Sequence, residues 1–191
     1  MQVSYAIRAV GWIEAGLWAL GTSALFVVGY VWSDARDAQQ HGAQELRELI
    51  LTPSLPRPAS HEGSLVGRVE IARLNISAMI FEGTSERTLD RGVGHLTSSA
   101  KPEGSGNVVL AAHRDTFFRP LQSVRVGDGI VVTTPQGQHR YEVKSTEIVQ
   151  PTNVSVIQPT SENTLTLITC YPFTFVGAAP ERFIVHADRS K

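Results

Sequence analysis

The chain has 191 residues and a formal net charge of −1 at pH 7, which suits one globular domain with accessory segments. Its lysines and arginines are scattered instead of gathered in runs, so the sequence predicts no nucleic-acid partner. A single cysteine excludes an intramolecular disulfide and any structural metal site built from several thiolates.

The first segment with a clear character is apolar. Residues 15–32 read AGLWALGTSALFVVGYVW and carry no charge, which is enough to cross a bilayer. A buried core helix is the alternative, but the segment has neither an apolar stripe nor a polar face. A cleaved signal peptide fits less well, because the segment exceeds a usual h-region and no good A-x-A site follows. We therefore predict that residues 1–32 are an uncleaved transmembrane anchor.

The charges around this segment predict its orientation. Arg8 precedes it, whereas Asp34, Arg36 and Asp37 follow it, so the positive-inside bias favours a cytoplasmic N-terminus. Residues 33–51 are rich in helix formers, and three prolines then interrupt the stretch TPSLPRPASHEGS. The sequence thus predicts a juxtamembrane helix and a proline-rich linker over 33–61, with an extracytoplasmic globular domain over 62–191.

Beyond residue 62 the pattern changes to short β-branched runs divided by turn signals. Several runs alternate apolar and polar residues, and residues 135–137 supply a hairpin turn. Short helices are expected at 85–90 and 117–121, but long helices do not alternate with the strands as a parallel α/β sheet would require. We predict a mainly β fold, a closed and mostly antiparallel barrel. The runs are VGRVEIARL, ISAMIFEG, NVVLAAH, GDGIVVTTPQGQHRYEVKSTEIV, TLTLITC and RFIVHA.

Three residues at the ends of such runs are candidates for chemistry. Cys170 ends TLTLITC, His113 ends NVVLAAH, and Arg182 begins RFIVHA twelve positions after the cysteine. An imidazole near a thiol can take its proton and later protonate a leaving amine, and a guanidinium can stabilise an oxyanion. Taken singly, each also has an ordinary interpretation: a buried thiol, a surface histidine, and an arginine paired with Glu181. Spacing alone does not decide between these interpretations.

The longer motifs resemble one known family. TLTLITCYPF at 164–173, AAHRDTFFRPL at 111–121 and APERFIVHA at 179–187 closely resemble the sortases, particularly the class D-like branch. The resemblance runs from about residue 66 to 187, with the three blocks in the family's order. It departs from the family at Ala112, where many relatives have Gly, and at Ala72, where an I-P-x-L pattern is common.

The resemblance implies a fold and a role for each candidate residue. It implies an eight-stranded sortase β-barrel with Cys170 as nucleophile, His113 as the essential histidine and Arg182 as the oxyanion-stabilising arginine. It also implies that Thr169 and Tyr171 contribute to the substrate site. The neighbouring aromatic residues are expected either to line the substrate cleft or to belong to the core; they are Phe117, Phe118, Phe173 and Phe175.

The resemblance further implies a cysteine transpeptidase of the peptidase class of hydrolases. Sortases cut an LPxTG-like C-terminal sorting signal between Thr and Gly, form a thioester, and pass the acyl group to an amine. That amine would belong to a cell-wall peptide or to a pilin lysine. No cofactor is expected. Calcium was considered because four acidic residues are candidates to meet on a loop, but no metal is assigned; these residues are Glu82, Glu86, Asp90 and Glu103.

Other functions fit the sequence less well. Papain-like peptidases place Cys before His, the reverse of the order here, and the His-Gly-Cys signature of cysteine L,D-transpeptidases is absent. Residues 98–101 (SSAK) match the S-x-x-K of penicillin-binding enzymes, but Pro102 opposes a continuing helix and no K-T-G follows. A membrane-tethered binding module with an inert Cys170 is the non-enzymatic alternative, and it predicts that Cys170→Ala retains function.

Overall fold

The structure is a computed structural model that describes residues 2–52, 60–175 and 177–190. The chain divides into two compact units, residues 1–37 and residues 38–191. The boundary between them falls inside one long helix, α1 (Gln2–Leu51). Part of the predicted proline-rich linker, residues 53–59, lies outside the described residues. The prediction that the catalytic domain begins at residue 62 stays a prediction, whereas the compact unit that holds the barrel begins at Ala38.

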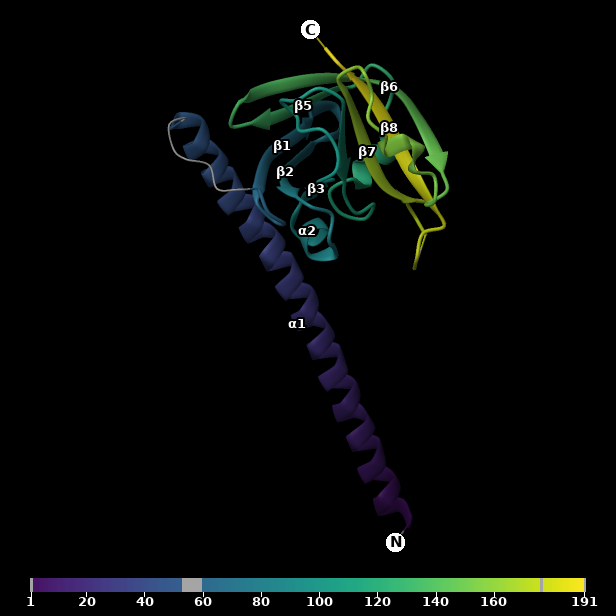
Figure 1. The fold of residues 1–191 in the computed structure, drawn as a ribbon. Coiled ribbons are helices and arrows are strands. Elements are labelled where there is room, and N and C mark those ends of the chain that lie inside the picture. The colour runs from purple at the N-terminus through teal and green to yellow at the C-terminus, as the bar shows by residue number, and fades with distance from the viewer. Residues whose placement is uncertain (1, 53–59, 176, 191) are drawn as a thin grey trace. The chain divides into compact units, whose positions relative to one another are not determined.

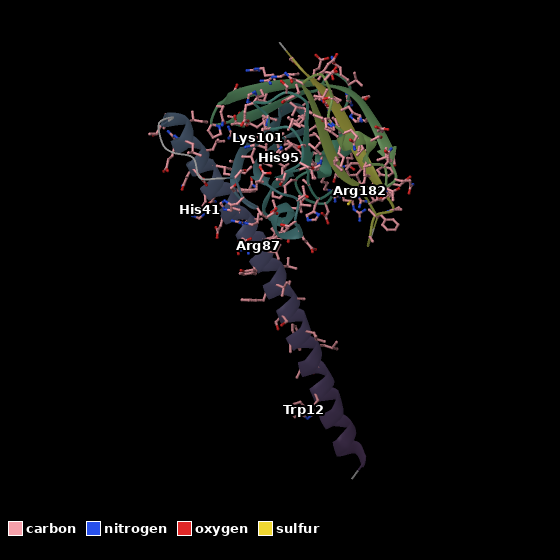
Figure 2. All side chains as sticks on the ribbon, viewed as in Figure 1. Trp12, His41, Arg87, His95, Lys101 and Arg182 are labelled. Atoms are coloured by element: carbon pink, nitrogen blue, oxygen red, sulfur yellow. The ribbon has the colours of Figure 1, made fainter. Side chains whose placement is uncertain are left out.

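The first unit is the apolar part of α1. Its apolar side chains are exposed, including Trp18 (70 % exposed) and Phe26 (78 % exposed), and Figure 2 shows Trp12 standing away from the helix. Its one threonine, Thr22, donates its hydroxyl to the carbonyl of Trp18 at 2.8 Å, which satisfies a polar group without water. The helix is long and apolar enough to cross a membrane. The exposed apolar surface excludes the buried core helix that was the alternative for this segment.

The second unit is a closed barrel of eight strands (Figure 1). Around the barrel the order is β1-β2-β3-β4-β7-β8-β6-β5, so strands far apart in the sequence are neighbours. The strands are β1 (Leu65–Ile71), β2 (Ile76–Glu82), β3 (Val93–His95), β4 (Asn107–Ala111), β5 (Gly129–Thr134), β6 (Gly137–Val149), β7 (Thr164–Tyr171) and β8 (Glu181–Arg189).

Most neighbouring strands are antiparallel, as the sequence predicts, but β2–β3 and β4–β7 are parallel. A parallel pair needs a crossover connection, and the helix α2 (Glu86–Arg91) lies in the one between β2 and β3. Neither parallel pair was predicted, because alternation of apolar residues reports which face is buried and not strand direction. The strand β3 was also missed, since three residues are too few to show a period.

The predicted local elements are present with small shifts in their ends. Ser85 caps α2 by accepting a hydrogen bond from the Thr88 amide, as expected for a helix over 85–90. The expected helix near 117–121 is a short 3-10 helix, η2 (Arg119–Ser123). Residues 135–136 connect β5 to β6, as predicted for a hairpin. Two further 3-10 helices are η1 (Ala72–Leu74) and η3 (Val154–Ile157).

The core fills the barrel with alternate side chains from every long strand. On β7, Leu165 and Leu167 are fully buried, and on β8 Val185 and Ala187 lie beside them. Burying one such aliphatic side chain stabilises the fold by about 1.5–3 kcal/mol. Because strand side chains alternate between two faces, the residues between these positions point out of the barrel.

A second, smaller apolar cluster joins the end of α1 to the outside of β2. Ala38 and Leu46 of α1 are buried against Met79 and Phe81. Gln39 lies in the same contact: its Nε2 donates to the carbonyl of Arg91 at 2.8 Å, and its Oε1 accepts from the Met79 amide at 2.8 Å. These backbone groups lie just before the point where β2 begins to pair with β3. The Gln39 amide therefore replaces hydrogen bonds that the sheet does not yet supply.

An ion pair connects η1 to the turn before β5. Arg73 donates from Nε and Nη2 to the two carboxylate oxygens of Asp128, both at 2.5 Å, and from Nη2 to the carbonyl of Ser123. Asp128 is 7 % exposed and also accepts from the Arg125 amide. The hydrogen bonds from Arg73 hold the pKa of Asp128 below its ordinary value of 3.8.

Candidate active site

Cys170 lies near the end of β7, between β4 on one side and β8 on the other. Its neighbours Leu167 and Thr169 face the barrel interior, where they are buried. By alternation, the side chain of Cys170 points to the outer face, and it is half-buried there. The thiol is thus on the outer side of the barrel wall and not in the core.

Arg182 lies directly opposite Cys170 on the neighbouring strand. The two residues are partners in the antiparallel register of β7 and β8, and residues directly opposite in such a pair project from the same face. Figure 2 shows Arg182 near the start of β8. Its Nη1 donates to the carbonyls of Ala179 (3.2 Å) and Glu181 (3.0 Å), which fixes the guanidinium beside the β7–β8 loop.

His113 approaches Cys170 from the other neighbouring strand. β4 pairs in parallel with β7 up to Ala111 opposite Ile168, and the Ala112 amide continues the pattern by donating to the Ile168 carbonyl. His113 is the next residue along the chain, just beyond this strand end. The His113 side chain is 32 % exposed, and its Nε2 lies 3.3 Å from Oδ1 of Asp90 on α2.

The register of β7 and β8 thus places Cys170 beside Arg182, and His113 follows the end of the strand on the other side of β7. A thiol, an imidazole and a guanidinium in this order supply a nucleophile, a proton carrier and an anion-binding group. The arrangement is suited to acyl transfer through a covalent thioester.

Comparison with known proteins supports the same conclusion. The model of the sortase domain matches residues 69–190, which is more than half of the chain. The chain belongs to the sortase family. Sortase D of Bacillus subtilis (strain 168) is 33% identical over 185 residues, covering 87% of this chain and 93% of that protein. The chain is accordingly a sortase transpeptidase that resembles class D.

Solved sortase structures share the fold. A Clostridium perfringens sortase D5 transpeptidase has a TM-score of 0.69 at 23% identity and covers 83% of this chain and 99% of its own. Sortase C from Clostridium perfringens SM101 has a TM-score of 0.63 at 26% identity, and the match covers 83% of this chain and 90% of that structure. The predicted closed sortase barrel of eight strands is thereby confirmed.

In this sortase Thr169 is an interior residue. It is 2 % exposed, and its hydroxyl donates to the carbonyl of Ala112 at 2.7 Å. The bond ties the residue before Cys170 to the residue before His113. The hydroxyl of Thr169 therefore holds these two strand ends together.

Tyr171 belongs to an aromatic cluster next to the thiol. Its ring stacks on Phe183 at 6.3 Å and meets the edge of Phe173 at 6.0 Å. The other predicted aromatics divide between the two expected roles: Phe118 is fully buried in the core, whereas Phe175 is 44 % exposed. Phe173 and Phe183 also pack against the barrel core, so the cluster extends the apolar core to this end of β7.

The connection between β6 and β7 is held against β4 in the sortase. Asn107 of β4 donates from Nδ2 to the carbonyls of Val156 (3.1 Å) and Gln158 (3.2 Å) in that connection. Its Oδ1 accepts from the Thr166 hydroxyl of β7 at 2.8 Å. Asn107 thus holds the connection against β4 and β7, upstream of the half-buried Cys170.

The four acidic residues that are candidates for calcium have different surroundings, and only Glu82 and Glu103 line one cavity. Glu82 is buried, with both carboxylate oxygens 3.2 Å from Nδ1 of His95, and Asp90 contacts His113. Figure 2 shows His95 within the barrel. Among the residues that the structure describes, no group of three or more His, Cys, Asp or Glu side chains is arranged to hold a metal ion.

A cavity of about 260 Å³ lies away from the thiol, between the end of α1 and the barrel. Its lining includes Glu45, Glu82 and His95 but not Cys170, His113 or Arg182. The cavity is therefore separate from the three candidate catalytic residues.

Two contacts at the site were not predicted from the sequence. Asp90 was considered only as an acidic loop residue, and Arg114, which follows His113 directly, was given no role. Arg114 donates to backbone carbonyls of the β7–β8 loop. Only its position beside His113 in the AAHRDTFFRPL motif signals its importance, because its partners lie about 60 residues later.

Proposed function

We propose that this sortase is a single-pass membrane enzyme that cleaves an LPxTG-like sorting signal between Thr and Gly. The acyl group passes to Cys170 as a thioester and then to an amine. The observation that carries the proposal is the placement of Cys170 between β4 and β8, with His113 and Arg182 at the adjoining strand ends. Cys170, His113 and Arg182 are the proposed catalytic residues, and Thr169 and Tyr171 shape the substrate site.

The reaction follows from these positions. Cys170 Sγ attacks the threonyl carbonyl carbon, and the carbonyl electrons move to oxygen to form a tetrahedral oxyanion, to which Arg182 donates hydrogen bonds. Collapse of this intermediate breaks the C–N bond, and His113 gives a proton to the departing glycyl amine. The incoming amine then attacks the thioester, returns a proton to His113 and releases Cys170 as thiolate.

The proposed partners follow from the same chemistry. The donor is a secreted protein with a C-terminal sorting signal, and the acceptor is an amine of a cell-wall peptide or of a pilin lysine. No cofactor takes part in these steps. The apolar helix α1 is the proposed anchor, with its N-terminus in the cytoplasm and the barrel outside, because Arg8 precedes the span and acidic residues follow it.

A mass measurement on the intact protein tests the proposal. The full-length chain in detergent is incubated with a library of LPxT-type peptides and an amine acceptor. Because the chain has one cysteine, an acyl adduct that hydroxylamine removes must be a thioester on Cys170. We expect the adduct and the amide product with the natural chain, and neither with Cys170→Ala. A natural chain that no peptide acylates, or a Cys170→Ala chain that still transfers, would contradict the proposal.

A further inference from the structure

The β7–β8 loop, residues 172–180, follows the proposed nucleophile directly and returns to Arg182. Three of its carbonyls point at one side chain from another part of the chain. Arg114 Nη1 donates to Pro172 at 3.1 Å, and Nη2 donates to Phe175 at 2.6 Å and to Gly177 at 3.0 Å. The Arg114 guanidinium carbon also lies 5.8 Å from the centre of the Phe175 ring.

This set of contacts is unusual for a surface arginine. Exposed ion pairs contribute little, since two mobile side chains must be ordered to make one contact. Here one planar group binds three backbone carbonyls, so it fixes the path of the loop and not merely the position of another side chain. A hydrogen bond from a charged donor is also stronger than one between neutral groups.

Arg114 links the two segments that carry proposed catalytic residues. It follows His113 directly, and its partner loop follows Cys170 after one residue. One side chain therefore connects the segment that carries the proposed proton carrier to the segment that carries the proposed nucleophile. The loop also contains Phe173, whose ring contacts that of Tyr171, the residue between Cys170 and the loop.

We propose that Arg114 is a positioning residue that holds the β7–β8 loop as one wall of the peptide-binding site. It touches neither the thiol nor the scissile bond in this role. It sets the affinity for the sorting peptide by keeping the loop in one conformation before the peptide arrives, which lowers the entropic cost of binding. This inference rests on the proposed function.

The test compares Arg114→Met, Arg114→Lys and the natural chain, all full-length in detergent. Arg119→Met is the matched control, because Arg119 is an exposed arginine of η2 near the same segment. For Arg114→Met we expect the KM for the peptide to rise about tenfold, with kcat changed by less than about threefold. Arg114→Lys keeps the charge but not the planar guanidinium, so its KM should lie between those of Arg114→Met and the natural chain. The control should behave as the natural chain does.

Two measurements that need no turnover separate this role from the alternatives. Hydrogen exchange at residues 173–178 should become faster in Arg114→Met and stay unchanged in Arg119→Met. The rate at which iodoacetamide alkylates Cys170 should stay within about twofold of the natural rate, because Arg114 acts on the loop and not on the thiol.

A result that contradicts any of the expected kinetic, exchange or alkylation results overturns the inference. Unchanged loop exchange in Arg114→Met means that the loop is held by other contacts. A fall in kcat at constant KM, or slower alkylation, means that Arg114 acts on the reacting groups themselves. If the natural chain forms no thioester at all, the proposed function fails, and the exchange measurement still decides whether Arg114 holds the loop.

Discussion

Asp90 is the charged neighbour of His113 on α2, and the contact joins Nε2 to Oδ1 at 3.3 Å. Both side chains are partly exposed, at 32 % and 44 %, so water screens the pair. Such a pair orients the imidazole more than it stabilises the fold. Nε2 is the ring nitrogen that faces Asp90, so the contact sets the direction in which the imidazole ring points.

Replacing Asp90 should therefore have a small and specific effect. We expect Asp90→Ala to lower kcat about two- to fivefold, the range that an exposed pair of up to about 1 kcal/mol allows, with KM unchanged. Steady-state kinetics with a sorting peptide measures both constants. Glu86→Ala, which removes an exposed carboxylate from the same helix, is the control and should leave kcat unaltered. Equal losses in the two variants would show that helix charge, and not the contact to His113, is responsible.

At the scale of secondary-structure elements, α2 is held at both ends by segments that precede the barrel strands. Glu62 accepts from the Thr88 hydroxyl at 2.8 Å and from the Ser85 amide at 3.3 Å. Hydrogen bonding by the side chains of Ser85 and then Thr88 lowers the pKa of Glu62. At the other end, Gln39 of α1 binds the carbonyl of Arg91 and the amide of Met79. The helix that carries Asp90 thus depends on residues outside the strand pattern.

Gln39→Leu tests this dependence. The substitution keeps the volume but leaves the Met79 amide and the Arg91 carbonyl without their side-chain partner, which we expect to cost about 1–3 kcal/mol of unfolding free energy. Amide exchange at Met79 should become faster. Gln40→Leu, at an exposed neighbouring position of the same helix, is the control. If the two variants unfold at the same denaturant concentration, the Gln39 contacts contribute nothing to stability.

Much at this scale could be read from the sequence. The long strands follow from alternation, and Cys170, His113 and Arg182 stand out because strand ends are visible as the ends of apolar runs. The contacts of Asp90, Arg114 and Gln39 could not be predicted, because they depend on how loops and helix ends pack in three dimensions. The parallel pairing of β4 with β7, which brings His113 toward Cys170, could not be predicted either, because the alternation within one strand does not show which strand it pairs with.

For the whole molecule, the Arg73–Asp128 pair predicts a dependence of stability on pH. Because Arg73 lowers the pKa of Asp128 in the folded state, the pair contributes fully above the ordinary pKa of 3.8. Its contribution is lost as the pH falls through the lower folded value, where the carboxylate is protonated. Acid therefore weakens a link between η1 and the start of β5 that is intact at neutral pH.

The prediction concerns Asp128→Asn. At pH 7 the variant should lose about 1–2 kcal/mol of unfolding free energy, a figure that allows for solvent on the Arg73 side. As the pH falls below 3.8 the difference from the natural chain should shrink, because the natural chain then loses the stabilisation that the lowered pKa of Asp128 provides. Urea unfolding followed by near-ultraviolet circular dichroism at pH 7, 5 and 3 measures this. Asp115→Asn, an exposed loop position, is the control, and a difference that does not shrink in acid would contradict the assignment.

The bond from Thr169 to Ala112 joins residues 57 positions apart, and this separation also has a meaning for folding. Contacts of such long range form slowly, because closing the intervening chain into a loop costs entropy before the stabilising contact forms. Both β5 and β6 lie in that loop, and β8 follows only after β7. A chain that has not yet closed its barrel therefore carries a thiol without an opposing imidazole. Transpeptidase chemistry becomes available only with completion of the fold, so unfinished molecules are inactive instead of indiscriminately reactive.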